Sequence, residues 1–355
     1  MHPYSQMPDR SFWRKFVSDS PWRDLGLNDS PKFKFQAHDL VATAGSCFAQ
    51  HISRYMKRVG LAPYIAEPAH VLMQQAGDVL ESYSAFSARY GNIYTSRQCL
   101  ELFNQAFEII PIIEDFVEED GKWFDLLRPN VEKGGYSSLH EAQSDRSYHL
   151  ERVKVMFETT DVFIFTLGLT ECWLNTKAGY AYPACPGTVH GTHVPDEHHF
   201  HNFRCAEVIS DLCALISGLT AVNAGIKIVL TVSPVPLVAT HTGNNVLVAS
   251  SYSKSVLRAA VGEIAAIFDN VAYFPSYEII SHPASFGQYL ASDLREVTER
   301  GVAHVMDCFL TSFYDSHPQA DATKDTPLTA RPITTPAEEP PPECEELFNL
   351  KPEDA

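Results

Sequence analysis

The stretch "VATAGSCFAQHISRYMKRVG", residues 41–60, changes from a strand pattern to a helix pattern at its centre. Its first four residues are a short apolar run that is typical of a buried strand. Small residues follow at Gly45, Ser46 and Cys47. Apolar side chains then recur at helical spacing, at Phe48, Ile52, Met56 and Val59. The stretch therefore predicts a strand, a tight turn and a helix, with a hydroxyl and a thiol at the turn.

Three further stretches have the near-continuous apolar pattern of strands that are buried on both faces. They are "DVFIFTLG" at 161–168, "KIVLTVSPVP" at 227–236 and "NVAYFPSYEI" at 270–279. Helical patterns separate or follow them, at 145–158, 204–223, 250–268 and 297–313. Strands that alternate with helices indicate an α/β fold with a mostly parallel sheet.

The chain divides into three parts by composition. Residues 1–35 are a polar lead-in, and residues 36–315 form the α/β domain, with a loop-rich surface insertion expected within 111–150. Residues 316–355 are rich in proline and acid and are expected to be disordered. Within them, "CEELFNL" is a candidate segment for binding a protein partner, and a solvated tail is the alternative.

Charge and hydropathy exclude several classes of function. The formal net charge of −17 argues against a nucleic-acid surface. The N-terminus has no apolar signal core and we find no run of about 20 apolar residues, so we expect no membrane insertion and a cytoplasmic location. No pair of the eight cysteines has C-x-x-C spacing, so most are expected to be buried small hydrophobes.

Ligands of parallel α/β sheets bind beyond the carboxyl ends of the strands. The segments 45–47, 168–171 and 233–236 follow three strands and should therefore converge at one edge. Cys47 would lie at a helix N-terminus, where unpaired N–H groups favour thiolate and can hold an oxyanion. Ser46 could cap the helix. The alternative is that Cys47 is inert and only fills space at a tight turn.

The motif "TAGSCFAQHI" resembles the signature of the GSCFA family. Further blocks are similar to that family in the same order, over about residues 12–313: "YGNIYTSRQ" (90–98), "FTLGLTECW" (165–173), "HHFHNF" (198–203), "TVSPVPL" (231–237), "YSKSVLRAAVGE" (252–263) and "YFPSYEI" (273–279). The family looks like a distant branch of the SGNH/GDSL hydrolases, which are flavodoxin-like three-layer α/β enzymes. The resemblance therefore implies that fold and an esterase or acyltransferase activity.

The resemblance also implies roles for individual residues. Cys47 takes the position of the nucleophile and Ser46 that of the preceding aspartate, although which of the two attacks stays open. Gly91 and Asn92 match the oxyanion-hole block. The third block of the superfamily, Gly-x-Asn-Asp/Glu, reads here as Gly168, Thr170 and Glu171, so threonine replaces asparagine.

The general base is the main departure from the SGNH pattern. Asp293 is present, but Glu296 stands where the superfamily has histidine. His199 or His201 is our first choice as a substitute, and His51, His282 and His317 are the alternatives. The histidine-rich loop "HGTHVPDEHHFHNF" (190–203) also has spacings that suit a metal, but a polar loop or a wall of the active site is favoured, so neither a metal nor a cofactor is expected.

The resemblance thus implies an acyl esterase or O-acyltransferase that acts on a glycan or another hydroxylated small-molecule acceptor through an acyl-enzyme. A donor such as acetyl-CoA would suit a cytoplasmic enzyme of surface polysaccharide biosynthesis. The alternative is a binding protein that has kept the fold without the chemistry and uses its acidic tail to recruit a partner. Residues Thr170 and Glu296 favour that alternative, since they replace superfamily side chains.

Overall fold

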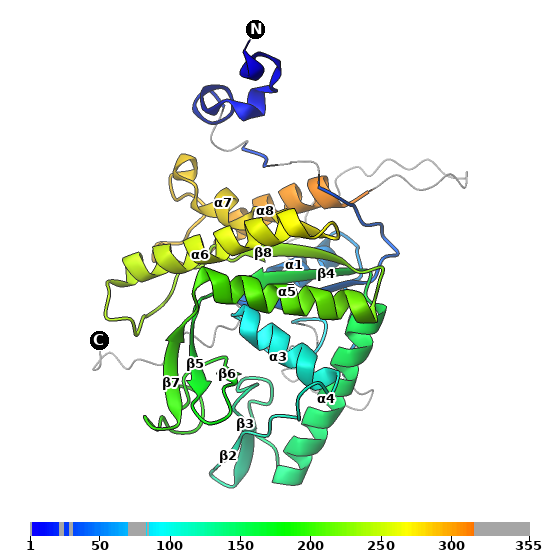
Figure 1. The fold of residues 1–355 in the computed structure, drawn as a ribbon, viewed down its shortest axis with the longest axis vertical. Coiled ribbons are helices and arrows are strands. Elements are labelled where there is room, and N and C mark those ends of the chain that lie inside the picture. Colours follow the sequence, from blue (N-terminus) through cyan, green and yellow to red (C-terminus); the bar gives the residue numbers. More distant parts are fainter. Residues whose placement is uncertain (1, 21–24, 28–30, 70–82, 84, 316–355) are drawn as a thin grey trace.

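A parallel sheet of four strands lies at the centre of the computed structural model, which describes residues 2–20, 25–27, 31–69, 83 and 85–315 (Figure 1). Its strands are ordered β1 (Val41–Gly45), β4 (Val162–Leu167), β8 (Lys227–Val232) and β9 (Val271–Phe274). All neighbouring pairs are parallel. The predicted strands are confirmed, and residues 316–355 with their candidate partner segment lie outside the described part.

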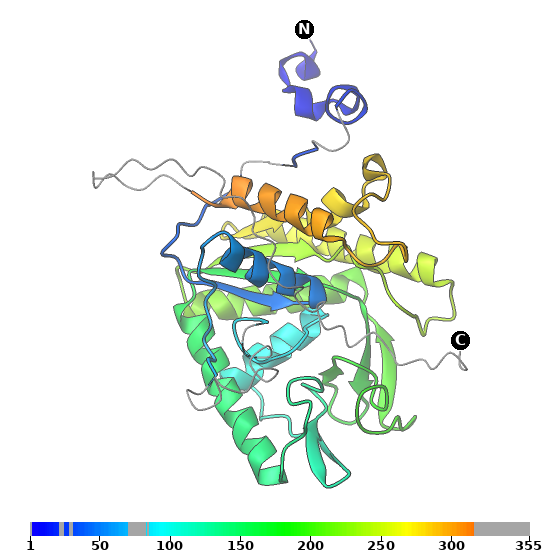
Figure 2. The ribbon, with the colours of Figure 1, turned by 180° about the vertical axis from the view of Figure 1, so that it is seen from behind.

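Helices cover both faces of the sheet and give three layers (Figures 1 and 2). One face packs against α1 (Cys47–Arg58), α7 (Ser276–Ser281) and α8 (Glu299–Phe313). The other packs against α3 (Ser96–Ala106), α4 (Leu139–Thr159), α5 (Cys205–Val222) and α6 (Val246–Ile267). The predicted α/β three-layer sandwich with a central parallel sheet is therefore confirmed.

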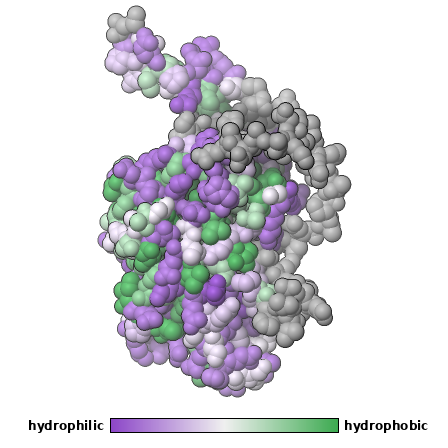
Figure 3. Space-filling view, turned by 90° about the vertical axis from the view of Figure 1, so that its right-hand side faces the viewer, coloured by the Kyte–Doolittle hydropathy of each residue, from purple (hydrophilic) through white to green (hydrophobic). Residues whose placement is uncertain are grey.

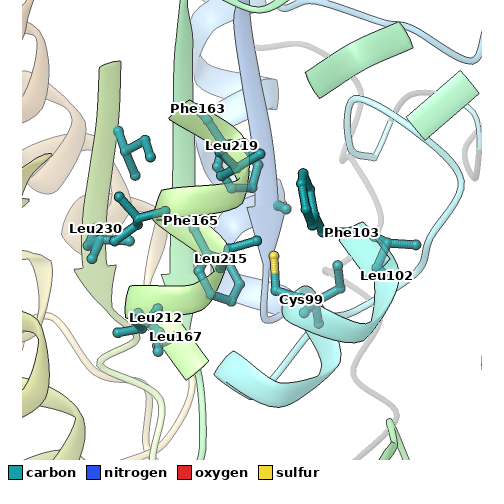
Figure 4. Close-up of a cluster of buried hydrophobic side chains, with 14 of the residues drawn as sticks. Cys99, Leu102, Phe103, Phe163, Phe165, Leu167, Leu212, Leu215, Leu219 and Leu230 are labelled. Atoms are coloured by element: carbon teal, nitrogen blue, oxygen red, sulfur yellow. The ribbon is translucent and has the colours of Figure 1, made fainter. Parts of the chain in front are cut away.

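Strand β4 shows why its sequence is apolar throughout. Val162 and Ile164 belong to the core on the α1 side, whereas Phe163 and Phe165 belong to the core on the α5 side. Figure 4 shows the second core, where side chains of α3 and α5 lie around the phenylalanines. The thiol of Cys99 lies among them, and burial raises its pKa, as expected for a cysteine that serves as a small hydrophobe.

Two small antiparallel sheets extend beyond the central one. One contains β6 (Ala181–Tyr182), β5 (Glu171–Asn175) and β7 (His198–Asn202), in that order. The other is a hairpin of β2 (Phe116–Glu119) and β3 (Lys122–Asp125). The prediction of a loop at the histidine-rich segment was therefore wrong in its last part, because five of those residues pair with β5 as a strand.

The surface insertion predicted within 111–150 is exposed at the turn of the hairpin, residues 120–122, but it is partly buried at the end of β3 and just after it. Asp125 and Arg128 are buried and form an ion pair at 2.9 Å, and Arg128 also binds Asp145 at 2.8 Å. Burial alone would raise the pKa of Asp145, but the charges of Arg128 and Arg89 lower it to about 2. Because Arg89 precedes the segment 90–93 directly, this network anchors that segment to α4.

Strand β1 is an edge strand whose outer side is covered by irregular backbone. The N–H groups of Tyr64, Ser87 and Ile93 donate to carbonyl oxygens of β1, those of Val41, Thr43 and Gly45. These bonds satisfy backbone groups that an open edge would leave unpaired. They also bring the segment that precedes α3 to the carboxyl end of β1.

Helix α5 is, among the described residues, long and apolar enough to cross a membrane. It packs against α3 and α6 and supplies Leu212, Leu215 and Leu219 to the core, so it is a core helix of this fold.

Residues 2–20 form three short helical turns, η1 (Pro3–Gln6), η2 (Asp9–Ser11) and η3 (Arg14–Ser18), at one end of the molecule. A fourth, η6 (Pro283–Ser285), follows α7. Figure 3 shows one side of the molecule, where hydrophilic and hydrophobic side chains are interspersed.

Substitution of Gly45 by alanine is expected to destabilise the fold strongly. Gly45 has φ +140°, and a Cβ there would lie 2.3 Å from the carbonyl oxygen of Thr166. We expect a loss of about 3 kcal/mol or more in the free energy of unfolding, measured by urea denaturation. Gly60→Ala is the control, because Gly60 also has positive φ (+82°) but open space around it, and it should cost only about 1 kcal/mol. Equal losses in the two variants would contradict the steric explanation.

Candidate active site

The turn between β1 and α1 is fixed by backbone contacts with β4. The Ser46 N–H donates to the Thr166 carbonyl at 3.1 Å, and Gly45 allows that close approach. Ser46 holds the N-cap position of α1, but its side chain makes no capping hydrogen bond, so the predicted capping role was wrong. Its hydroxyl is buried and has no hydrogen-bond partner among the described residues. A buried polar atom in this state is costly and marks a site that a ligand can complete.

Cys47 is the first residue of α1, directly beyond the carboxyl end of β1. Its side chain is buried, with 7% of its surface exposed. The first N–H groups of a helix have no partner within the helix, and the helix dipole makes this end positive. The predicted position of Cys47 at a helix N-terminus is therefore confirmed, and the predicted effect of that position on its thiol stays a prediction.

Gly91 and Asn92 lie beside this turn. The N–H of Ile93 donates to the Gly45 carbonyl at 2.8 Å, which holds the segment against the end of β1. The Asn92 side chain accepts a hydrogen bond from Gln50 Nε2 at 3.2 Å, and Gln50 lies one turn after Cys47 on α1. The predicted oxyanion block is therefore brought next to the start of α1.

Gly168 approaches Ser46 from the end of β4. A Cβ on Gly168 would lie 3.0 Å from Ser46 Cβ and 3.1 Å from the Tyr94 ring, so a larger residue would disturb the turn. Its N–H donates to the Tyr94 carbonyl at 2.8 Å, and its own carbonyl accepts from Lys254 Nζ at 2.7 Å. Lys254 lies on α6 and is buried, and its ammonium group fixes the strand end.

Thr170 and Asn202 form a pair that the sequence did not predict. Thr170 is fully buried and donates its hydroxyl to Asn202 Oδ1 at 2.7 Å, and its N–H donates to Ser253 Oγ at 3.0 Å. The bond fixes the Asn202 amide and leaves its two N–H groups to donate elsewhere. The block 168–171 has threonine where the superfamily has asparagine. Strand β7, which is distant in sequence, brings Asn202 to that block instead. The signal in the sequence was the family-like block "HHFHNF" (198–203), which contains Asn202.

Glu171 begins β5 and accepts hydrogen bonds from loop residues beyond β8. Thr240 Oγ1 donates to Oε1 at 2.8 Å, and the His241 N–H donates to Oε2 at 3.4 Å. Burial raises the pKa of Glu171, and these two bonds oppose the rise. The carboxyl group therefore ties the 168–171 segment to the loop that follows β8.

His199 and His201 lie on a different face of the small sheet from Asn202. They pair with Leu174 and Cys172 in register, whereas Asn202 pairs with Glu171. Because side chains alternate along a strand, both histidines point away from the face that carries Asn202. His201 Nε2 lies 2.9 Å from Glu207, which orients that ring. Their predicted role as a base stays a prediction, and the structure does not bring them together with Asn202.

Asp293 and Glu296 lie in the exposed loop before α8. Asp293 accepts hydrogen bonds from the N–H groups of Arg295 and Glu296, which lower its pKa. Arg295 Nε donates to the Pro236 carbonyl at 3.2 Å, so the loop is attached to the segment that leaves β8. Both carboxylates therefore lie on the edge of the molecule where the strands end, with Glu296 open to solvent.

The remaining histidine candidates lie in different settings. His51 is on α1, one turn beyond Cys47, with its ring against Phe48. His282 precedes η6 and its ring lies 5.4 Å from that of Trp13, whereas His317 is outside the described residues. The described residues contain no group of three or more His, Cys, Asp and Glu side chains that could hold a metal ion.

Comparison with models of protein families finds a match. The model of the GSCFA family matches residues 40–309, from the residue before β1 to a point within α8. The matched range includes each predicted site residue described above. No curated protein matches the chain.

The stability of the fold is expected to fall in acid partly through His51. Burial of its imidazole lowers the pKa to about 4, and Arg54 and Arg58 add repulsion. The unfolded chain binds a proton near pH 6.5 and the folded chain does not, so stability is lost as the pH falls from 6.5 towards 4. Allowing for its partial exposure, we expect about 2 kcal/mol from this group between pH 7 and 4.5.

His51→Asn tests this expectation. Measured by urea denaturation, the free energy of unfolding should fall between pH 7 and 4.5 by about 2 kcal/mol less in this variant than in the unmodified protein. His38→Asn, at an exposed position before β1, is the control and should leave the difference unchanged. An acid dependence that is the same in His51→Asn and in the unmodified protein would contradict the assignment.

Proposed function

The chain belongs to the GSCFA family, and we propose that it is an acyl esterase or O-acyltransferase whose nucleophile is Cys47. The observation that carries the proposal is the position of this thiol at the first residue of α1, directly beyond β1. Gly168 and the Thr170–Asn202 pair are at the end of the adjacent strand. This arrangement combines a nucleophile, helix N–H groups and an amide donor at one edge of a parallel sheet.

In the first step, the Cys47 thiolate attacks the carbonyl carbon of an ester or thioester. A C–S bond forms, and the carbonyl π electrons move to the oxygen, which becomes an oxyanion. The N–H groups at the start of α1 and the Asn202 amide are the proposed donors to that oxyanion. The intermediate collapses to a thioester on Cys47 as the C–O or C–S bond to the leaving group breaks; a leaving alcohol takes its proton from solvent water, and a leaving thiol can depart as thiolate.

In the second step, water or a hydroxyl of an acceptor attacks the thioester and transfers its proton as Cys47 leaves as thiolate. Transfer to water gives hydrolysis, and transfer to an acceptor hydroxyl gives a new ester. This step needs a proton acceptor, and Glu296 is our proposal, since its loop is attached to the exit of β8 and its carboxylate is exposed there. Asp293 holds the turn of that loop through its two backbone hydrogen bonds.

A thiol also makes the missing histidine less important. A serine must lose its proton during attack, so it needs a base close to neutral pKa. A thiol at a helix N-terminus can lose its proton before substrate binds, because that end of the helix stabilises the anion. Relative to the SGNH pattern, cysteine replaces the nucleophilic serine and Glu296 replaces the histidine. These two differences are then consistent with each other.

The acceptor class in the proposal is a glycan or another hydroxylated small molecule, with an activated acyl donor of the CoA type. The support is the resemblance to SGNH enzymes, many of which act on sugar esters. A role in surface polysaccharide biosynthesis in the cytoplasm belongs to the same proposal.

One observation favours the alternative, a binding protein without chemistry. The Thr170 hydroxyl is buried and bonded to Asn202, so it is not directed at a substrate. In that case Cys47→Ala would leave the protein's biological role intact, whereas removal of residues 316–355 would abolish it.

The proposed acyl-enzyme can be detected directly. We expect the protein, incubated with an acyl thioester such as an N-acetylcysteamine thioester, to gain the mass of one acyl group on the peptide that contains Cys47. Cys47→Ala should remove the adduct, and Ser46→Ala should keep it, since its hydroxyl is not the nucleophile in this mechanism. Peptide mass spectrometry measures both.

Cys308→Ala is the matched control, because this cysteine is also buried but lies in α8. It should leave the adduct unchanged. Loss of the adduct in Ser46→Ala, with retention in Cys47→Ala, would assign the attack to serine. Absence of any adduct on either residue would overturn the proposal.

Asn202→Ala is expected to slow acylation by about 100-fold, as removal of one oxyanion donor does elsewhere. Alkylation of Cys47 by iodoacetamide should keep its rate, because that reaction forms no oxyanion. Asn244→Ala, in an exposed loop, is the control for acylation. A parallel loss of acylation and alkylation would instead mean that Asn202 only holds the site together.

A further inference from the structure

A cavity of about 260 Å³ lies directly beyond the 168–171 segment. It is lined by residues of β5, β7, the segment after β6 and the loop that follows β8. Its apolar lining includes Leu169, Trp173, Tyr182, Pro183, Phe200 and Leu237. The rings of Trp173 and Phe200 lie 5.7 Å apart, and the exposed His241 ring lies against both at the rim.

The segment 168–171 links the cavity to the candidate active site, because it contributes residues to both. Leu169 follows Gly168, which packs against Ser46, and Glu171 follows Thr170, which binds Asn202. Phe200 and Asn202 lie on the same face of β7, since they are two residues apart in a strand. The face that carries the proposed oxyanion donor therefore continues into the cavity wall.

Three polar side chains of the lining are already bonded within the protein. Thr240 donates to Glu171, Thr188 donates to the Cys185 carbonyl, and Tyr182 donates to Asp115. Sugar hydroxyls that approached these three side chains would have to displace their bonds, which is costly. An apolar group would instead bury surface against aromatic and aliphatic side chains.

We propose that this cavity binds the acyl chain of the substrate and that the preferred acyl group is an apolar one of several carbons, longer than acetyl. The inference rests on the proposed function, because it assigns a substrate class to the same site. The cavity is slightly smaller than the roughly 300–1,000 Å³ usual for small-molecule sites, which suits one short or medium chain. An acetyl group would leave most of it empty.

The test compares acetyl and hexanoyl thioesters of N-acetylcysteamine. We expect hexanoyl to acylate Cys47 about tenfold faster or more, since four extra carbons are buried. Ala239→Phe should bring this ratio close to one, because Ala239 lines the cavity and is exposed, so that the larger ring fills the space without disturbing the core. Ala178→Phe, exposed in the turn between β5 and β6, is the matched control and should keep the ratio.

Binding of hexanamide, which cannot acylate the protein, separates this inference from the proposed function. Saturation-transfer NMR should detect hexanamide on the unmodified protein and on Ala178→Phe, and not on Ala239→Phe. If no thioester acylates Cys47 but this pattern is seen, the proposed function fails and the apolar site stands. Equal acylation by acetyl and hexanoyl, or hexanamide binding that Ala239→Phe does not change, would overturn the inference.

Discussion

The close contact between Gly45 and Thr166 is the constraint on which the site depends. A side chain at residue 45 would meet the backbone of β4, so only glycine lets β1 end this near to its neighbour. The same approach lets the Ser46 N–H bond to the Thr166 carbonyl, and it starts α1 at the next residue. The position of Cys47 at a helix N-terminus is therefore a consequence of how two parallel strands fit together.

Much of the central layer could be predicted from the sequence, because fully buried parallel strands read as uninterrupted apolar runs. Strands β4, β8 and β9 all lie within predicted stretches, and α5 and α8 agree with theirs to within two residues at each end. The small sheet of β5, β6 and β7 was not predicted, because alternating histidines do not look like a strand. Pairing of β7 with β5 decides its conformation, and pairing is not visible in one sequence.

The site residues also divide into those that could be identified from the sequence and those that could not. Cys47, Gly91 and Gly168 could be found because they follow strands or match family blocks, and the structure brings their segments together. Asn202 and Lys254 could not be assigned their roles from the sequence, because these roles depend on tertiary contacts with Thr170 and Gly168. A buried lysine on an amphipathic helix has the same pattern as a solvated one, and only the partner carbonyl distinguishes them.

The most direct test of the proposed mechanism is the pH dependence of Cys47 alkylation in the folded protein, followed by peptide mass spectrometry. In that mechanism the start of α1 stabilises the thiolate before substrate binds. The alkylation rate should therefore reach half its maximum clearly below pH ~8.5, the value for an unperturbed cysteine. A half-maximum at or above that pH, or no alkylation until the protein unfolds, would contradict it and identify Cys47 as a packing residue.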